Sequence, residues 1–207
     1  MFTGIITAIG TIDTAGKRGD LRVRISCPFD PADMDIGASI ACSGICLTIV
    51  ERGGEAGNGW FAVDVSDETI SCSVAGMWEA GQLLNLETAL KLGDELGGHI
   101  VTGHVDAVGT LVSLEDAGGS HKLTIRAPRE LAAYLAPKGS VTVNGVSLTV
   151  NDVTDRADGS CDFTLNIIPH TWEVTTLGSL SQGNQVNLEI DTVARYLHRM
   201  QQLKPAP

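Results

Sequence analysis

The sequence of this 207-residue chain contains two copies of one pattern, and this duplication limits the fold more than any other feature. The blocks match in the same order in both halves, and the spacing between partners drifts by only single residues. The matched pairs are Phe2–Thr11 with Val101–Thr110, Leu21–Pro28 with His121–Pro128, Ser43–Val50 with Asn144–Asn151, Phe61–Thr69 with Phe163–Thr171, and Gly81–Glu87 with Gly183–Glu189. Chance similarity would not keep this order, so the pattern indicates a tandem duplication.

We therefore expect two copies of one small domain, at residues 1–95 and 96–188, followed by a separate segment at 189–207. The copies meet near Leu92–Gly98, whose sequence is LGDELGG. Each copy is close to the size of a small independent domain.

Within each copy the apolar residues are mostly Val, Ile and Leu in short runs broken by Gly, Asn and Asp, which is typical of β-strands joined by tight turns. The first copy has extended runs at residues 2–12, 20–27, 38–51, 59–66 and 82–90, and the second has their counterparts. Asn144-Gly145 and Ser43-Gly44 each interrupt an alternating run, which predicts a tight turn or bulge. Many short strands at this spacing indicate an all-β fold with a small closed barrel in each copy.

Helix is expected in few places. PRELAAYLAP, Pro128–Pro137, begins with proline at a favoured first-turn position, and SVAGMWEAG, Ser73–Gly81, is a candidate short connector. Glu189–Leu203 places Ile190, Val193, Leu197 and Met200 on one face, with Asp191 or Thr192 as cap and Arg199 and Lys204 near the C-terminal end. This amphipathic helix either packs on its own domain or mediates self-association.

Charge and cysteine content limit the partners and the compartment. The net charge of −11 argues against binding to nucleic acid or to anionic membranes, so small molecules or proteins are the expected partners. Five cysteines without a C-x-x-C pair fit reduced thiols in a cytoplasmic protein. The N-terminal sequence MFTGIITAIGTID has no basic region and no long apolar stretch, so neither a signal peptide nor a membrane span is expected.

Together, these motifs resemble the riboflavin synthase family, in its duplicated lumazine-binding form, over essentially the whole chain. The segments that carry the resemblance are MFTGII at the start, GICLT at Gly44–Thr48, NLE at Asn85–Glu87, GGHIVTGHVD at Gly97–Asp106, VNGVSLTV at Val143–Val150, IPHT at Ile168–Thr171 and VNLEID at Val186–Asp191. Their order and their presence in both copies make the match specific, whereas each motif alone is weak.

The resemblance implies two tandem six-stranded Greek-key β-barrels and a C-terminal helix that assembles a homotrimer. It implies a transferase of riboflavin biosynthesis that dismutates two molecules of 6,7-dimethyl-8-ribityllumazine into riboflavin and 5-amino-6-(D-ribitylamino)uracil by moving a four-carbon unit. Neither a metal nor another cofactor is implied. Each active site would lie between the first barrel of one subunit and the second barrel of its neighbour, and an association with lumazine synthase is left open.

The family's ligand-contacting positions carry over to this sequence as one group per copy. In the first copy they are Gly4, Ile5, Ile6, Cys46, Leu47, Thr48, Asp64, Val65, Ser66, Asp67, Glu68 and Thr69. In the second they are Gly103, His104, Val105, Lys138, Ser147, Leu148, Thr149, Asn166, Ile167, Ile168, Pro169, His170 and Thr171, with Asp191 as a further candidate.

Three of these residues are candidates for chemistry. Cys46 is either a thiol that adds to the bound ring or transfers a proton, or a small buried strand residue. Ser147, together with Thr149, either hydrogen-bonds the ligand or satisfies the strand backbone. His104, which replaces Ile5 of the first copy, either relays the proton of the acidic methyl group or caps a glycine-rich turn.

The remaining candidates also keep two interpretations. Lys138 either balances developing negative charge or is an ordinary surface lysine. Asp191 either holds a ribityl hydroxyl or caps the last helix.

The spacing of His99 and His104 does not match a zinc site. Cys42, Ser43 and Thr88 depart from the family's usual residues, which affects the expected geometry of the first pocket.

Three functions are compatible with the sequence. The first is the enzyme, and the second is a chromophore carrier, since the same duplicated barrel serves in lumazine- and flavin-carrying antenna proteins of bioluminescent bacteria. The third is an oligomeric barrel without a ligand. Polar pocket residues in both copies favour the enzyme.

Overall fold

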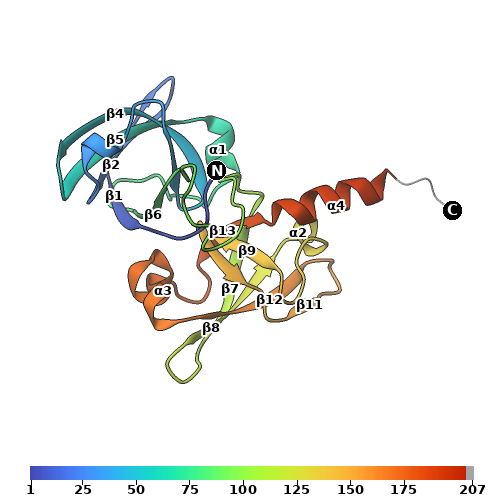
Figure 1. Cartoon of the computed structure of the whole chain (residues 1–207). Coiled ribbons are helices and arrows are strands. Elements are labelled where there is room, and N and C mark those ends of the chain that lie inside the picture. The colour runs from blue at the N-terminus through green and yellow to red at the C-terminus, as the bar shows by residue number, and fades with distance from the viewer. Residues whose placement is uncertain (204–207) are drawn as a thin grey trace.

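The computed structural model describes residues 1–203, so Lys204 and the rest of the expected 189–207 tail segment lie outside the described residues. The two copies lie one above the other, and the last helix projects away from both (Figure 1). Strands of the first copy end at Thr88 and strands of the second begin at Ala107. The segment between them contains no helix or strand and passes between the two copies.

The first copy is a closed antiparallel barrel of six strands. Neighbouring strands follow the order β1-β2-β5-β4-β3-β6, and hydrogen bonds between β1 and β6 close the ring. The strands are β1 Ala8–Arg18, β2 Asp20–Cys27, β3 Ser39–Cys42, β4 Ile45–Glu55, β5 Asn58–Val65 and β6 Leu83–Thr88. The barrel predicted for this copy is confirmed.

The second copy repeats this arrangement with one strand divided. Its order is β10-β9-β13-β7-β8-β12-β11, a sheet that is not closed as the first barrel is and whose edge strands β10 and β11 both correspond to β4. The strands are β7 Ala107–Asp116, β8 His121–Ala127, β9 Ser140–Val143, β10 Val146–Thr149, β11 Val153–Asp155, β12 Cys161–Ile167 and β13 Gln185–Ile190. Where β10 ends, Asn151 N–H donates to Thr164 O and Thr164 N–H to Asp152 O. The expected six strands thus become seven, because the chain bends at 150–152, close to where β4 has its bulge between Ile49 and Glu51.

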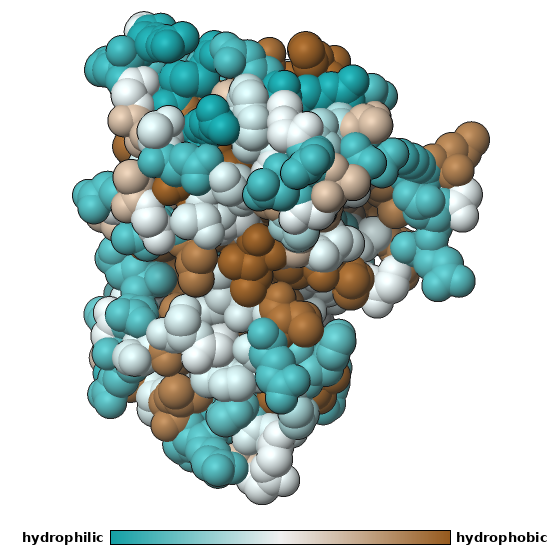
Figure 2. All heavy atoms as spheres, turned by 90° about the vertical axis from the view of Figure 1, so that its left-hand side faces the viewer, coloured by the Kyte–Doolittle hydropathy of each residue, from teal (hydrophilic) through white to brown (hydrophobic). Residues whose placement is uncertain are grey.

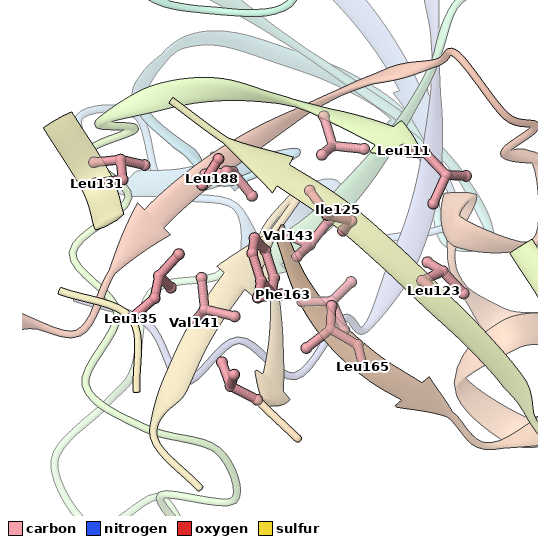
Figure 3. Packing of buried hydrophobic residues seen from close by; sticks show 14 of the residues in the cluster. Leu111, Leu123, Ile125, Leu131, Leu135, Val141, Val143, Phe163, Leu165 and Leu188 are labelled. Carbon is pink, nitrogen blue, oxygen red and sulfur yellow. The ribbon is translucent and has the colours of Figure 1, made fainter. Parts of the chain in front are cut away.

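Each barrel has its own apolar core. Alternate residues of each strand point inward, as the period of a half-buried strand requires. Phe61, Val63 and Ile25 are fully buried in the first core. Figure 3 shows Phe163, Leu123, Ile125, Val143 and Leu188 meeting in the second. Burial of each such side chain contributes about 1.5–3 kcal/mol relative to exposure.

The turn predictions at the two dipeptides are confirmed. Ser43-Gly44 and Asn144-Gly145 join β3 to β4 and β9 to β10 as two-residue hairpin loops. All four residues have positive φ, from 46° to 85°, which is the geometry that two-residue hairpins favour.

The expected strand at 2–12 is wrong in its first part. β1 begins only at Ala8, and Phe2 instead forms an isolated antiparallel bridge with Val101 of the linking segment. Both side chains are buried in a small cluster between the copies. An apolar residue at either position predicts a buried side chain, but the sequence does not reveal which segment covers that side chain.

The helical predictions are confirmed at the C-terminus, partly correct at Pro128–Pro137 and wrong at Ser73–Gly81. Of the expected Pro128–Pro137 helix only α2, Arg129–Ala132, forms, with Pro128 as its N-cap. Ser73–Gly81 has turns without a helix, whereas the unexpected α1, Asp67–Ser71, precedes it. The other short helices are α3 Pro169–Val174 and the 3-10 turns Pro31–Asp33 and Thr176–Ser179.

The C-terminal helix α4, Thr192–Gln202, is confirmed together with its cap. Asp191 Oδ1 accepts a hydrogen bond from Val193 N–H at 2.8 Å. No residue of α4 is buried, and Val193, Leu197 and Met200 are each more than half exposed. The helix therefore does not bury its apolar face on its own domain. No helix among residues 1–203 is long and apolar enough to span a membrane.

Candidate functional site

The two copies meet across a pseudo-symmetric seam formed by their equivalent hairpin turns. Gly44 and Gly145 lie so close that a Cβ on Gly44 would be 2.8 Å from the Gly145 nitrogen, and one on Gly145 would be 2.7 Å from the Gly44 nitrogen. Only glycine fits such an approach of two backbones. Cys46 and Ser147 follow these turns by two residues and are therefore close to the seam.

The segments that reach Cys46 and Ser147 come from the opposite copies. They are the segments around Gly103, which reaches Cys46, and around Gly4, which reaches Ser147, and we call them the crossing segments. Gly103 O accepts a hydrogen bond from Cys46 N–H, and Gly4 O accepts one from Ser147 N–H, both at 2.8 Å. Gly4 and Gly103 have φ of +77° and +78°. A Cβ on Gly103 would be 2.6 Å from Cys46 Cβ, so a larger residue would collide with the strand.

The side chains of the crossing segments also pack against the opposite copy. Ile6 packs against the core of the second barrel, and Val105 packs against the core of the first. The sequence-based grouping placed Gly4, Ile5 and Ile6 with Cys46, and Gly103–Val105 with Ser147. The structure instead brings Gly4 to Ser147 and Gly103 to Cys46, because each segment crosses the seam before its own barrel begins.

Cys46 lies on β4, where strand alternation separates it from its neighbours. Leu47 is buried in the core, while Cys46 is half-buried and Thr48 is exposed. Cys46 is in register with Ala41 of β3. The thiol is thus on the outside of the barrel wall, where it packs against the small apolar cluster between the copies and stays partly accessible, which is compatible with contact to a ligand.

Ser147 on β10 has a partner that the sequence did not suggest. Its Oγ is 2.7 Å from His99 Nδ1, and His99 N–H donates to Thr3 O. His99 is buried, and its Nε2 has no hydrogen-bond partner among the described residues. Burial lowers the pKa of His99, and the negative charge of Asp191 opposes that shift. The arrangement favours a neutral imidazole that fixes the Ser147 hydroxyl.

His104, the other histidine of this segment, has an exposed side chain. Its backbone N–H donates to Glu189 at 3.0 Å, so the main chain is held while the imidazole faces solvent. Residues 1–203 contain no group of three or more metal-ligating side chains.

The candidate residues at the ends of β5 and β12, and directly after them, are only partly exposed. Val65 and Ile167 are fully buried in the two cores. The Asp64 carboxylate binds the Arg22 guanidinium through two hydrogen bonds, at 2.6 and 3.0 Å, and this holds the pKa of Asp64 below its usual value. Ser66 accepts from Thr69 N–H as the N-cap of α1. The side chains left exposed here are Asp67, Glu68, Asn166, Ile168, Pro169 and His170, with Thr171 half-buried.

The remaining candidates divide between surface and structural positions. Lys138 is exposed at a left-handed position, φ 68°, and its N–H donates to Val150 O. Thr149 is exposed and Leu148 packs partly on the second core. Asp191 caps α4, as described above, which supports the structural one of its two interpretations.

Two cavities lie near the contacts between the copies, and the smaller one borders a crossing segment. The larger, about 730 Å³, is between the copies and is lined by residues such as Ser43, Asn144 and Asn187. The smaller, about 290 Å³, is lined by Thr3, Ile5 and Glu87 among others. Cys46 and Ser147 do not line either cavity.

Comparison with known proteins agrees with this architecture. A model of the lumazine binding domain matches the chain twice, at residues 3–89 and 102–191. The riboflavin synthase of Brucella abortus is 45% identical over 206 residues, covering 98% of both chains. The chain belongs to the riboflavin synthase family. Riboflavin synthases of Photobacterium phosphoreum and Bacillus subtilis are 44% and 34% identical, over 97% and 96% of this chain and 88% and 89% of theirs.

Solved structures match the fold of this family member as well. The crystal structure of LumP complexed with riboflavin has a TM-score of 0.75 at 25% identity and covers 92% of this chain and 99% of that one. The structure of LumP with 6,7-dimethyl-8-(1'-D-ribityl) lumazine has a TM-score of 0.74 at 23% identity, which concerns the fold alone.

The family motif NLE contains residues whose role the sequence did not disclose. Asn85 Nδ2 donates to Asn144 O at 2.9 Å and its Oδ1 accepts from Thr176 N–H at 2.8 Å. Asn187 mirrors this with Ser43 O at 3.0 Å and Val74 N–H at 2.9 Å. Each asparagine therefore binds the other copy. The repetition of NLE was the available signal, but it gave no indication of contact between the copies.

Proposed function

We propose that this chain is a riboflavin synthase, which converts two molecules of 6,7-dimethyl-8-ribityllumazine into riboflavin and 5-amino-6-(D-ribitylamino)uracil. The observation that carries the proposal is that two complete lumazine-binding copies occur in one chain that is 45% identical to a riboflavin synthase over nearly its full length. The four-carbon unit lost by one lumazine is gained by the other. The reaction is therefore balanced without an external oxidant or reductant.

Positioning is the main contribution that we assign to the protein. Two flat molecules of the same substrate must be held face to face, and removing the bimolecular entropy cost is worth roughly 7–11 kcal/mol in well-oriented systems. A duplicated binding domain supplies one pocket for each molecule. The differences between Cys46 and Ser147, and between Ile5 and His104, fit unequal roles of donor and acceptor.

We assign the side-chain roles as follows. Cys46 contacts the ring in the first pocket, and Ser147, oriented by His99, does so in the second. His104, whose imidazole is exposed while its backbone is fixed, is the candidate to move the methyl proton. Thr48, Thr149 and Lys138 are candidate binding groups at the exposed edges of the two pockets.

We further propose a cytoplasmic homotrimer in which α4 joins the subunits. Support comes from the exposed apolar face of α4 at Val193, Leu197 and Met200. In this arrangement the first barrel of one subunit faces the second barrel of the next, so paired substrates lie between subunits. The division at 1–95, 96–188 and 189–207 and an association with lumazine synthase remain part of the same proposal.

A carrier that binds the chromophore without turnover is the second candidate, and the resemblance to LumP complexed with riboflavin favours it. The higher identity to riboflavin synthases, 45% against 25%, favours the enzyme.

The two candidates differ when purified protein is mixed with 6,7-dimethyl-8-ribityllumazine as the only organic reactant. The enzyme produces a rising riboflavin absorbance. A carrier changes the lumazine fluorescence and yields no riboflavin. A protein that changes neither signal is not explained by either proposal.

A further inference from the structure

Two buried carboxylates lie at equivalent places at the ends of β6 and β13. Glu87 and Glu189 have exposed fractions of 5% and 1%, and neither is paired with a basic side chain in the described residues. A buried unpaired carboxylate is unfavourable unless several donors surround it. Burial accordingly raises the pKa of both groups, while hydrogen bonds from the neighbouring threonines oppose the shift.

The donors come from the segments that cross the seam. Glu189 accepts from Thr102 N–H and Oγ1–H, both at 2.7 Å, from Gly103 N–H at 2.9 Å and from His104 N–H at 3.0 Å. Glu87 accepts from Thr3 N–H at 2.6 Å, Thr3 Oγ1–H at 2.7 Å and Gly4 N–H at 2.9 Å. Each carboxylate thus fixes the glycine that approaches the other copy.

The consequence is a crossed connection between the copies. Glu189 belongs to the second barrel, but the Gly103 that it holds accepts the hydrogen bond of Cys46 in the first barrel. Glu87 belongs to the first barrel, but the Gly4 that it holds accepts the hydrogen bond of Ser147 in the second. Both glycines have positive φ and no room for a Cβ, so each turn depends on glycine at this position.

We propose that Glu87 and Glu189 are positioning residues, each of which sets the geometry of the pocket in the opposite copy. Glu189 places Gly103 against Cys46, and Glu87 places Gly4 against Ser147. The proposal rests on the proposed function only in treating Cys46 and Ser147 as pocket residues, because the contacts themselves do not depend on the substrate.

A carboxylate suits this role because it only accepts hydrogen bonds and offers about four acceptor sites. Glutamine has nearly the same shape, but its NH₂ group would face backbone N–H donors. Hydrogen bonds to a charged group are stronger than those between neutral groups, so the substitution should release the glycine turn.

The test compares Glu189→Gln with Glu87→Gln by hydrogen-exchange mass spectrometry, using overlapping peptides that isolate the Cys46 and Ser147 amides. Glu189→Gln should accelerate exchange at Cys46 by about tenfold or more and leave Ser147 within about twofold, as expected from loss of one charge-assisted contact. Glu87→Gln should do the reverse. Each variant is the matched control of the other.

Two outcomes would overturn the proposal. One is acceleration confined to the variant's own copy, and the other is equal acceleration at both amides, which would indicate general loosening of the fold. If either glutamine variant does not fold, Thr102→Val and Thr3→Val remove only the hydroxyl donors. Thr102→Val should accelerate exchange mainly at Cys46, and Thr3→Val mainly at Ser147, both by less than the glutamine variants. Acceleration of the other amide in each variant would refute the proposal.

A second readout uses Cys46 as a chemical reporter in a Cys72→Ser background, because Cys72 is exposed whereas Cys27, Cys42 and Cys161 are buried. Glu189→Gln should change the alkylation rate of Cys46 severalfold, and Glu87→Gln should not. Added riboflavin should protect Cys46 in the unaltered chain. Lack of protection would count against the proposed function, whereas the exchange pattern alone decides the crossed positioning.

Discussion

At the scale of single residues, Cys46 and Ser147 occupy equivalent places but have different surroundings. Ser147 Oγ is 2.7 Å from His99 Nδ1, whereas the hydrogen bond found for Cys46 is made by its backbone N–H, which donates to Gly103 O. A thiol and a fixed hydroxyl differ in nucleophilicity and in hydrogen bonding. The difference supports separate roles for the two bound molecules.

Replacing Cys46 by serine should reduce turnover at saturating substrate by about tenfold or more, the scale of losing one group that acts in the transition state. The Michaelis constant should change less, because size and backbone contacts are kept. Steady-state kinetics with 6,7-dimethyl-8-ribityllumazine measure both values. Unchanged turnover would make Cys46 a packing residue.

His99 should make the protein less stable in mild acid. Its pKa is lowered by burial from an ordinary value near 6.5, so below pH 6.5 the unfolded chain binds a proton that the folded chain does not. The free energy of unfolding should therefore fall as the pH drops from 6.5 toward the folded pKa, by at most about 1.4 kcal/mol per pH unit.

Urea unfolding at several pH values, compared with His99→Gln, isolates this contribution. Glutamine can still hydrogen-bond Ser147 but does not titrate, so its stability should depend less on pH. Equal pH dependence in the two proteins would contradict the assignment of His99 as a neutral buried group.

At the scale of elements, the asparagines of β6 and β13 connect the two barrels. Asn187→Ala should lower the free energy of unfolding by about 1–3 kcal/mol, because Val74 N–H and Ser43 O lose their partners. Asn85→Ala should have a similar effect, since its contacts are equivalent. The exposed neighbour Gln185→Ala is the control, and an equally large loss there would show that contacts between copies are not the cause.

The last helix is fixed at its base and free along its apolar face. Arg195 binds Asp106 through two hydrogen bonds at 2.6 and 2.9 Å, and Asp106 also accepts from Ile190 N–H. This contact sets the direction in which α4 leaves the second barrel (Figure 1). The helix thus presents Val193, Leu197 and Met200 away from the chain.

The double substitution Leu197→Ser and Met200→Ser should reduce the oligomeric state without unfolding the barrels, since both side chains are more than half exposed. Sedimentation velocity should show a smaller species, while circular dichroism keeps its β signal. Gln201→Ala is the matched control on the same helix. An unchanged sedimentation coefficient would exclude α4 as the assembly element.

Much of the element pattern could be predicted from the sequence, because strand alternation, the two Ser/Asn-Gly turns and the amphipathic final helix are local signals. The strand prediction was wrong at residues 2–7. The structure also places Gly4 beside Ser147 and Gly103 beside Cys46, which differs from the grouping of pocket residues predicted from the sequence. Both depend on which copy a crossing segment packs against. Internal repetition indicates that two units exist, but it contains no information about exchange of segments between them. The contact between His99 and Ser147 could not be predicted for the same reason, since the two residues are distant in the sequence.

At the scale of the whole molecule, each copy sends a segment to the other, beside Cys46 in the first copy and beside Ser147 in the second. Figure 2 shows apolar residues gathered across the middle of one face, at the height where the copies meet, between more polar surfaces above and below. Ile5, Leu96 and Ile100, from the crossing and linking segments, are each about half exposed. Exposed apolar surface of this kind is typical of a face that meets another subunit.

The most direct test of the central claim is the stoichiometry of conversion. Purified protein is incubated with 6,7-dimethyl-8-ribityllumazine alone, and substrate, riboflavin and 5-amino-6-(D-ribitylamino)uracil are quantified by chromatography over time. We expect two molecules of substrate to disappear for each riboflavin and each pyrimidine formed. Binding of the lumazine without riboflavin formation, or riboflavin formed in any other ratio, would contradict it.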